Sequence, residues 1–194
     1  MSPEPSGDVL LETPVGRERV TPVKIPVARY TSSEFFEREM TDVWPHAWQL
    51  ACTMDHVARP GDWHEYRVGR ISVLIVRGDD GVLRAFQNVC RHRGSELCSG
   101  SGADLAEIRC PFHRWTWGLD GRLREVPSRR EFGVLNDDYP LIGVQVDTWG
   151  PMVFVNLDPD AEPLAEFLDP VPAETAWAHL EEFRGQALIS VRAD

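Results

Sequence analysis

Two short cysteine–histidine pairs constrain the fold of this chain more than any other feature of its sequence. The first pair is Cys90 and His92, and the second, Cys110 and His113, follows after 17 residues. Thiolate and imidazole side chains are common ligands of iron and zinc. One metal centre can use both pairs only if the chain folds so that the two short segments meet.

The order of the ligands indicates the kind of centre. One cysteine and one histidine this close often occur together by chance, but a second such pair makes coincidence a poor explanation. A structural zinc site usually has its two cysteines roughly two to four residues apart, before its two histidines, and the order here is different. In a Rieske [2Fe–2S] cluster, two cysteines bind one iron and two histidines bind the other. We therefore predict that such a cluster is bound by Cys90, His92, Cys110 and His113, as cofactor-binding residues and metal ligands alike.

The segments around the two pairs resemble the cluster loops of Rieske non-haem iron oxygenases, the α subunits of aromatic-ring-hydroxylating enzymes. The resemblance is carried by CRHRG at 90–94 and CPFHRWTWGLDG at 110–121, and it extends from about Phe35 to Leu157. It implies a mainly β fold, a Rieske-type antiparallel β sandwich with a cluster-binding subdomain. One position departs from the family pattern, because Arg114 stands where glycine is common after the second ligand histidine.

The resemblance also separates the two main classes of Rieske protein. The respiratory class carries an extra cysteine in each loop, joined as a disulfide, and the corresponding residues here are Ser95 and Phe112. The low-potential oxygenase class is therefore expected. Cys98 has no partner in the second loop and is expected to be a buried thiol, and Trp115 is expected to lie over the cluster.

An oxygenase of this family needs a second centre, a mononuclear iron held by two histidines and a carboxylate. The chain has no histidine pair with the family's spacing, and no histidine follows His179. We expect this Fe(II) only in a catalytic domain that these residues do not contain, so no catalytic residue is assigned within the chain. The expected function is the electron-transfer portion of an aromatic-ring-hydroxylating mono- or dioxygenase in aromatic hydrocarbon catabolism.

Two other functions are consistent with the motif: a stand-alone Rieske-type ferredoxin, and a structural module that has kept the fold. The predicted helix before the cluster domain and the proline-rich segment after it favour an oxygenase, since a ferredoxin needs little beyond the sandwich. The resemblance implies a ferredoxin or flavin reductase as electron donor. It also implies neighbouring α subunits as partners in a homo-oligomer.

The composition narrows the other possibilities. The net charge of -11 disfavours nucleic acid as a partner, because phosphate binding needs clustered lysine and arginine. No apolar run approaches the roughly 20 residues of a membrane-spanning helix, and the first residues lack the basic and apolar parts of a secretory signal. A cytoplasmic protein without a membrane partner is expected.

Apolar periodicity and turn residues predict an N-terminal region at 1–47. Its first 30 residues hold five prolines and little periodicity, which indicates an extended arm or a partly disordered lead-in. Thr31 and Glu34 form a capping box, with Thr31 as the N-cap. One amphipathic helix is expected from there, ending before Pro45.

The remainder of the chain is predicted to form the Rieske domain at 48–158 and a proline-rich, helical segment at 159–194 that leads into the catalytic domain. Alternating apolar residues and Gly- or Asp-rich turns indicate short antiparallel strands in the Rieske domain. These strands are expected at 63–68, 71–76, 82–86, 115–118, 144–149 and 152–157. After the Rieske domain, helices are expected at 163–168 and 173–183, and a strand at 187–191.

Overall fold

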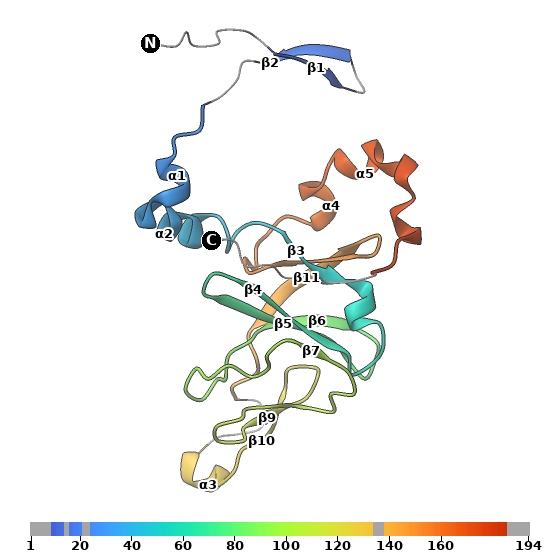
Figure 1. Ribbon diagram of the computed structural model, residues 1–194. Coiled ribbons are helices and arrows are strands. Elements are labelled where there is room, and N and C mark those ends of the chain that lie inside the picture. The colour runs from blue at the N-terminus through green and yellow to red at the C-terminus, as the bar shows by residue number, and fades with distance from the viewer. Residues whose placement is uncertain (1–8, 14–15, 21–23, 134–137, 186–194) are drawn as a thin grey trace. The chain divides into compact units, whose positions relative to one another are not determined.

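The chain divides into two compact units, Met1–Glu39 and Met40–Asp194. The second unit contains both cysteine–histidine pairs and the sheets around them. No helix in the described part of the chain combines the length and hydrophobicity that a membrane span requires. The structure, a computed structural model, describes residues 9–13, 16–20, 24–133 and 138–185 (Figure 1).

The first unit begins with a β-hairpin that the sequence does not predict. Strand β1 (Val9–Thr13) pairs antiparallel with β2 (Gly16–Val20), from Val9 opposite Val20 to Thr13 opposite Gly16. The expectation of an extended arm over residues 1–30 is therefore wrong for this part. The two strands are joined by backbone hydrogen bonds. Neither proline content nor apolar periodicity predicts which backbone groups will pair.

The predicted helix is present as α2 (Ser33–Asp42), preceded by one helical turn, α1 (Ala28–Thr31). Its N-cap is Ser32 and not the predicted Thr31, because the Ser32 Oγ accepts a hydrogen bond from the N–H of Phe35 at 3.2 Å. Ser32 has the extended backbone that an N-cap needs, with φ -82° and ψ 122°. Thr31 is still helical, and its hydroxyl donates to the carbonyl of Val27, the residue just before α1.

The second unit is built on an antiparallel sheet of seven strands in the order β3-β12-β11-β6-β5-β4-β7, with a smaller sheet in the order β10-β9-β8 (Figure 1). The prediction of a mainly β, antiparallel fold is confirmed. Each predicted strand lies within one residue of an observed strand at both ends. Four strands of this unit are not predicted, namely β3, β7, β8 and β10. Strands β7 and β8 have two residues each, which are too few to show a period. The large sheet comprises β3 (Gln49–Thr53), β4 (Trp63–Val68), β5 (Ile71–Arg77), β6 (Leu83–Gln87), β7 (Ser101–Gly102), β11 (Gly143–Trp149) and β12 (Met152–Asn156), and the small sheet comprises β8 (Ile108–Arg109), β9 (Thr116–Trp117) and β10 (Leu123–Glu125).

Strand β5 separates two hydrophobic cores. Leu74 and Val76 belong to the core that also contains both cysteines of the predicted site. Val73 and Ile75 belong to the other core, and all four side chains are fully buried. Successive side chains of a strand point to opposite faces. An uninterrupted apolar run is therefore what a strand covered on both faces requires.

The segment after β12 is less helical than predicted. The helix expected at 163–168 is confirmed as α4 (Leu164–Phe167). The single helix expected at 173–183 is wrong: His179 has a left-handed backbone, with φ 50°, and interrupts it. The strand expected at 187–191 lies outside the described residues. The other short helices of this unit are η1 (Met54–Val57), α3 (Arg129–Phe132), α5 (Val171–Glu174), η2 (Ala176–Ala178) and η3 (Leu180–Glu182).

Two hairpin turns of this unit share the pattern Gly-x-Asp-Gly. Gly81 and Gly121 occupy the same position in them, with φ +77° and +81°, and each donates a backbone hydrogen bond to the first glycine of its turn. Their surroundings differ. A Cβ on Gly121 would lie 2.5 Å from Cε1 of Phe86, whereas a Cβ on Gly81 would meet nothing within 4 Å.

This difference gives a matched pair of substitutions. Both Gly81→Ala and Gly121→Ala should lower the free energy of unfolding by about 1 kcal/mol, because alanine resists the left-handed backbone. Gly121→Ala should lower it by about 1–3 kcal/mol more, because the methyl group displaces the buried Phe86 ring. Urea unfolding of the two variants, prepared in the same way, measures both values. Equal losses would mean that Phe86 does not restrict this turn.

Candidate iron–sulfur site

The first cysteine–histidine pair lies in a tight loop, residues 90–95, named loop one. The N–H of Cys90 donates to the Ser95 carbonyl at 2.7 Å, and the N–H of Gly94 donates back to the Cys90 carbonyl at 2.9 Å. Gly94 has φ +75°. Glycine adopts this left-handed conformation without strain, so CRHRG closes on itself with Cys90 at its base.

The second pair lies in a loop with the same backbone, residues 110–115, named loop two. The N–H of Cys110 donates to the Trp115 carbonyl at 2.9 Å, and the N–H of Arg114 donates to the Cys110 carbonyl at 3.1 Å. Arg114 takes the position of Gly94, with φ +61°. The departure from the family pattern therefore places an arginine where the backbone favours glycine, at an expected cost of about 1 kcal/mol.

The two loops bring their cysteines together in the hydrophobic core. Cys90 and Cys110 are 3% and 1% exposed, both are free thiols, and their side chains are within hydrogen-bond reach. Burial raises the pKa of the Cys90 thiol, and Cys110 raises it further. The N–H groups of His92 and Arg93 point at the same sulfur and oppose that rise. Thiolates in this position would need a partner of positive charge.

The two histidines also form a pair, nearer the surface. The rings of His92 and His113 are 4.9 Å apart at 70°. His92 lies flat against Trp115, with ring centroids 4.9 Å apart and an angle of 4°, and its Nδ1 is shielded from solvent. Burial, followed by His113 and Arg93, lowers the pKa of His92, which favours the neutral imidazole. Neutral imidazole is the form that binds metals.

The structure thus brings the four predicted ligands together as two neighbouring pairs, with the thiols inside and the imidazoles outside. Among the residues that the structure describes, no three Cys, His, Asp or Glu side chains are grouped to hold a single metal ion. A Rieske cluster does not need such a group, because its thiolates bind one iron and its imidazoles bind the other. The donor set and its division into two pairs fit this cofactor.

Two other residues considered in the sequence do not belong to the predicted ligand set. Cys98 is a free, partly buried thiol whose pKa burial raises to about 11. The Phe112 side chain is 68% exposed and packs against the ring of His113.

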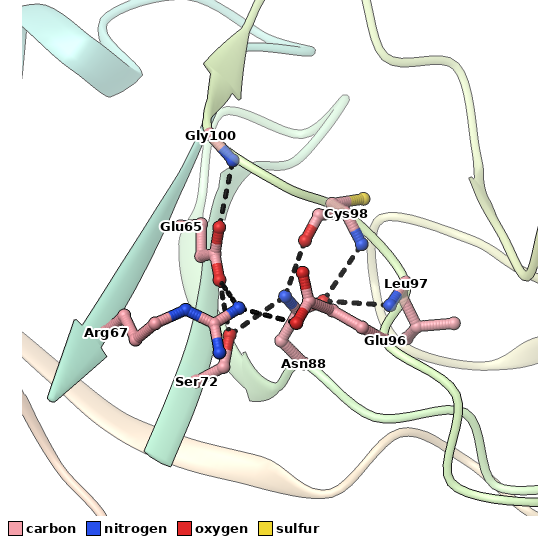
Figure 2. Close-up of polar contacts among 8 residues, drawn as sticks. All are labelled: Glu65, Arg67, Ser72, Asn88, Glu96, Leu97, Cys98 and Gly100. Carbon is pink, nitrogen blue, oxygen red and sulfur yellow. Dashed lines mark hydrogen bonds and ion pairs between the residues drawn. The ribbon is translucent and has the colours of Figure 1, made fainter. Parts of the chain in front are cut away.

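Sequence analysis missed a buried polar network at the base of loop one. Figure 2 shows Asn88, Ser72 and Glu65 joined by hydrogen bonds between strands β4 and β5 and the chain around Cys98. Asn88 is 3% exposed. The available signal was a polar residue two positions before a ligand cysteine, at the end of the apolar strand β6.

Comparison with known proteins assigns the family. Residues 47–148, more than half of the chain, match the family described as Rieske [2Fe-2S] domain. The chain belongs to this Rieske family. The predicted resemblance and the predicted cofactor type are therefore confirmed, and the matched region includes both loops.

The relatives of this Rieske chain are oxygenase subunits. It is 32% identical over 152 residues to the glycine betaine monooxygenase oxygenase subunit of Pseudomonas aeruginosa, covering 78% of this chain and 35% of that protein. It is 38% identical over 139 residues to the carnitine monooxygenase oxygenase subunit of Acinetobacter pittii, covering 70% and 37%. The chain thus spans about a third of the length of these relatives.

Solved structures give the same assignment. The apo form of a quaternary ammonium Rieske monooxygenase matches with a TM-score of 0.75 and 32% identity, over 81% of this chain and 47% of that one. Naphthalene 1,2-dioxygenase from Rhodococcus sp. matches with a TM-score of 0.70 and 26% identity, over 76% and 34%. The expected aromatic-ring dioxygenase is not supported, because the more similar proteins are named for quaternary ammonium compounds. The motifs that carried the resemblance are those of the cluster loops, and these loops do not form a substrate pocket in the prediction, so their motifs could not distinguish the two.

Proposed function

We propose that this Rieske chain is the electron-transfer portion of a monooxygenase, and that Cys90, Cys110, His92 and His113 hold its [2Fe–2S] cluster. The observation that carries the proposal is the arrangement of these four side chains in two neighbouring pairs. The two thiols lie side by side in the core, and the two imidazoles lie side by side nearer the surface. The cluster, when bound, takes up and releases one electron at a time.

The surroundings of the two pairs have distinct tasks in this proposal. The N–H groups of His92 and Arg93 point at the Cys90 sulfur, and such hydrogen bonds favour the charged thiolate. Trp115 is buried and fixes the ring plane of His92 by stacking. His113 is exposed, so it offers electrons a short path between the site and a partner at the surface.

Proteins that share this region are named for one class of substrate. Glycine betaine, carnitine and choline monooxygenases are among the relatives with more than 30% identity. All three compounds carry a quaternary ammonium group. We therefore infer that the oxygenase served by this Rieske chain oxidises a quaternary ammonium compound by a monooxygenase reaction.

The charge of the exposed residues on loop one and loop two suggests which kind of electron donor binds there. Arg91, Arg93 and Arg114 are exposed on the two loops, and neither loop contains an acidic residue. This cationic tip belongs to a chain of net charge -11. We propose that a reductase or ferredoxin with an acidic docking surface delivers electrons here, because complementary charge increases the rate of encounter. Neighbouring oxygenase subunits are proposed to complete the homo-oligomer.

The ligand assignment can be tested with the four cysteines of the chain. Protein reconstituted with iron and sulfide should be red-brown, with about two irons per chain, a Rieske-type EPR signal after reduction and a potential around -150 mV. Cys90→Ser and Cys110→Ser should abolish the visible absorbance, whereas the matched controls Cys52→Ser and Cys98→Ser should retain it. Stoichiometric zinc without visible absorbance, or loss of the cluster in the controls, would contradict the proposal.

The role of the cationic tip can be tested with Arg114→Gly. The variant should be about 1 kcal/mol more stable than the wild type, because glycine relieves the left-handed backbone. It should also accept electrons more slowly from an acidic ferredoxin at low ionic strength, with the difference disappearing in high salt. Stopped-flow reduction measures the rate, and Arg59→Ala, an exposed arginine outside both loops, is the control. Equal rates for all three proteins at low salt would exclude Arg114 from donor docking.

The substrate class can be tested in the host. Deletion of the gene should abolish growth on carnitine, glycine betaine or choline as sole nitrogen source, for at least one of the three. A copy encoding Cys98→Ser should restore growth, whereas one encoding Cys90→Ser should not. Unchanged growth on all three compounds, together with lost growth on an aromatic hydrocarbon, would reverse the inference in favour of aromatic substrates.

A further inference from the structure

Loop one and loop two have the same backbone but are closed differently at their bases. The chain on either side of loop two continues as strands β8 and β9, which pair Arg109 with Thr116 and Ile108 with Trp117. The chain on either side of loop one makes a single isolated bridge, between Val89 and Glu96. At the next position, where loop two has a second backbone pair, loop one has Asn88 opposite Leu97.

The Asn88 side chain takes the place of that second backbone pair. Its Oδ1 accepts hydrogen bonds from the N–H of Cys98 at 3.0 Å and of Leu97 at 3.3 Å. Its Nδ2 donates to the Cys98 carbonyl at 2.6 Å. One buried amide group thus joins the chain entering loop one to the chain leaving it (Figure 2).

The same amide group is anchored to the large sheet. Asn88 Nδ2 also donates to the Ser72 Oγ at 3.0 Å, and the Asn88 N–H donates to the Ser72 carbonyl at 3.0 Å. The Ser72 hydroxyl donates to Glu65 at 2.8 Å, and the second oxygen of Glu65 accepts from the N–H of Gly100 at 2.9 Å. The Glu65 side chain is 8% exposed.

The outer end of this network is closed by an arginine. Arg67 on β4 donates both to Glu65 and to Glu96, the residue that bridges Val89. Figure 2 shows the guanidinium between the two carboxylates. The base of loop one is therefore held to strands β4 and β5 by side chains, where the base of loop two is held by strand pairing.

We propose that Asn88 is the positioning residue that sets loop one against loop two, and so sets the spacing of the four ligands. The inference rests on the proposed cluster site and names a residue that acts on it through Cys90, two positions further on. Loop one supplies one ligand to each iron, so a shift of this loop alone would change the coordination of both. Metal–ligand distances tolerate changes of only about 0.2 Å.

The test compares Asn88→Ala with Gln49→Ala in the reconstituted full chain. Gln49 is also a buried amide with three hydrogen bonds, to Trp44, Ala47 and Tyr66. Its partner Tyr66 packs against the core that contains neither Cys90 nor Cys110. Asn88→Ala should shift the g values of the reduced cluster relative to the wild type. In the presence of a chelator, the visible absorbance of the cluster should bleach about tenfold faster in this variant than in the wild type. Gln49→Ala should be less stable to urea than the wild type, but with wild-type g values and bleaching rate.

A second variant covers the case in which Asn88→Ala does not fold. Ser72→Ala keeps the bonds from Asn88 to Leu97 and Cys98. It removes only the two hydrogen bonds of the Ser72 hydroxyl, the one accepted from Asn88 Nδ2 and the one donated to Glu65. It should shift the g values in the same direction by a smaller amount. Amide hydrogen exchange of Cys90 and Gly94 in the cluster-free chain should also quicken in both variants and not in Gln49→Ala.

The outcomes separate the two proposals. A wild-type chain that binds no cluster would overturn the proposed function, and this inference with it. A wild-type chain that binds the cluster, with Asn88→Ala or Ser72→Ala matching Gln49→Ala in g values, bleaching and exchange, would overturn this inference alone.

Discussion

The burial of strand β5 on both faces is the constraint on which the rest of this structure depends. Its apolar run fills two cores at once, and the core on one side also contains Cys90 and Cys110. A thiol pair in that position is shielded from water. Loop one follows strand β6 of the same sheet, whereas loop two lies between β8 and β9 of the small sheet. The proposed electron-transfer site is therefore built onto the hydrophobic core.

The two loops show how one backbone geometry can be reached from different sequences. Both close through the same pair of hydrogen bonds around a ligand cysteine, and both need a left-handed residue at the fifth position. Loop one meets this need with Gly94 and is supported by buried side chains. Loop two has Arg114 there and is supported by strand pairing, which helps to explain how it tolerates the less favourable residue.

Charge and burial divide the site into an inner and an outer part. The thiols lie inside, next to tryptophan and leucine side chains, while the imidazoles and arginines face outward. An exposed imidazole beside cationic side chains suits exchange of electrons with an acidic protein partner. The proposed link to quaternary ammonium compounds comes from the relatives, whose length the chain covers by about a third. None of the contacts around the two loops bears on substrate choice.

The sequence by itself determined the four candidate ligands, the family and the six strands β4, β5, β6, β9, β11 and β12. Ligand identity depends on side-chain chemistry at fixed spacing, and the strands depend on an alternation of period two, so both are local. Only the tertiary structure decided the role of Asn88, the N-cap at Ser32 and the break in the last helix at His179. Each of these depends on which distant or neighbouring backbone groups a residue meets after folding, and a pattern of polar and apolar residues does not contain that information.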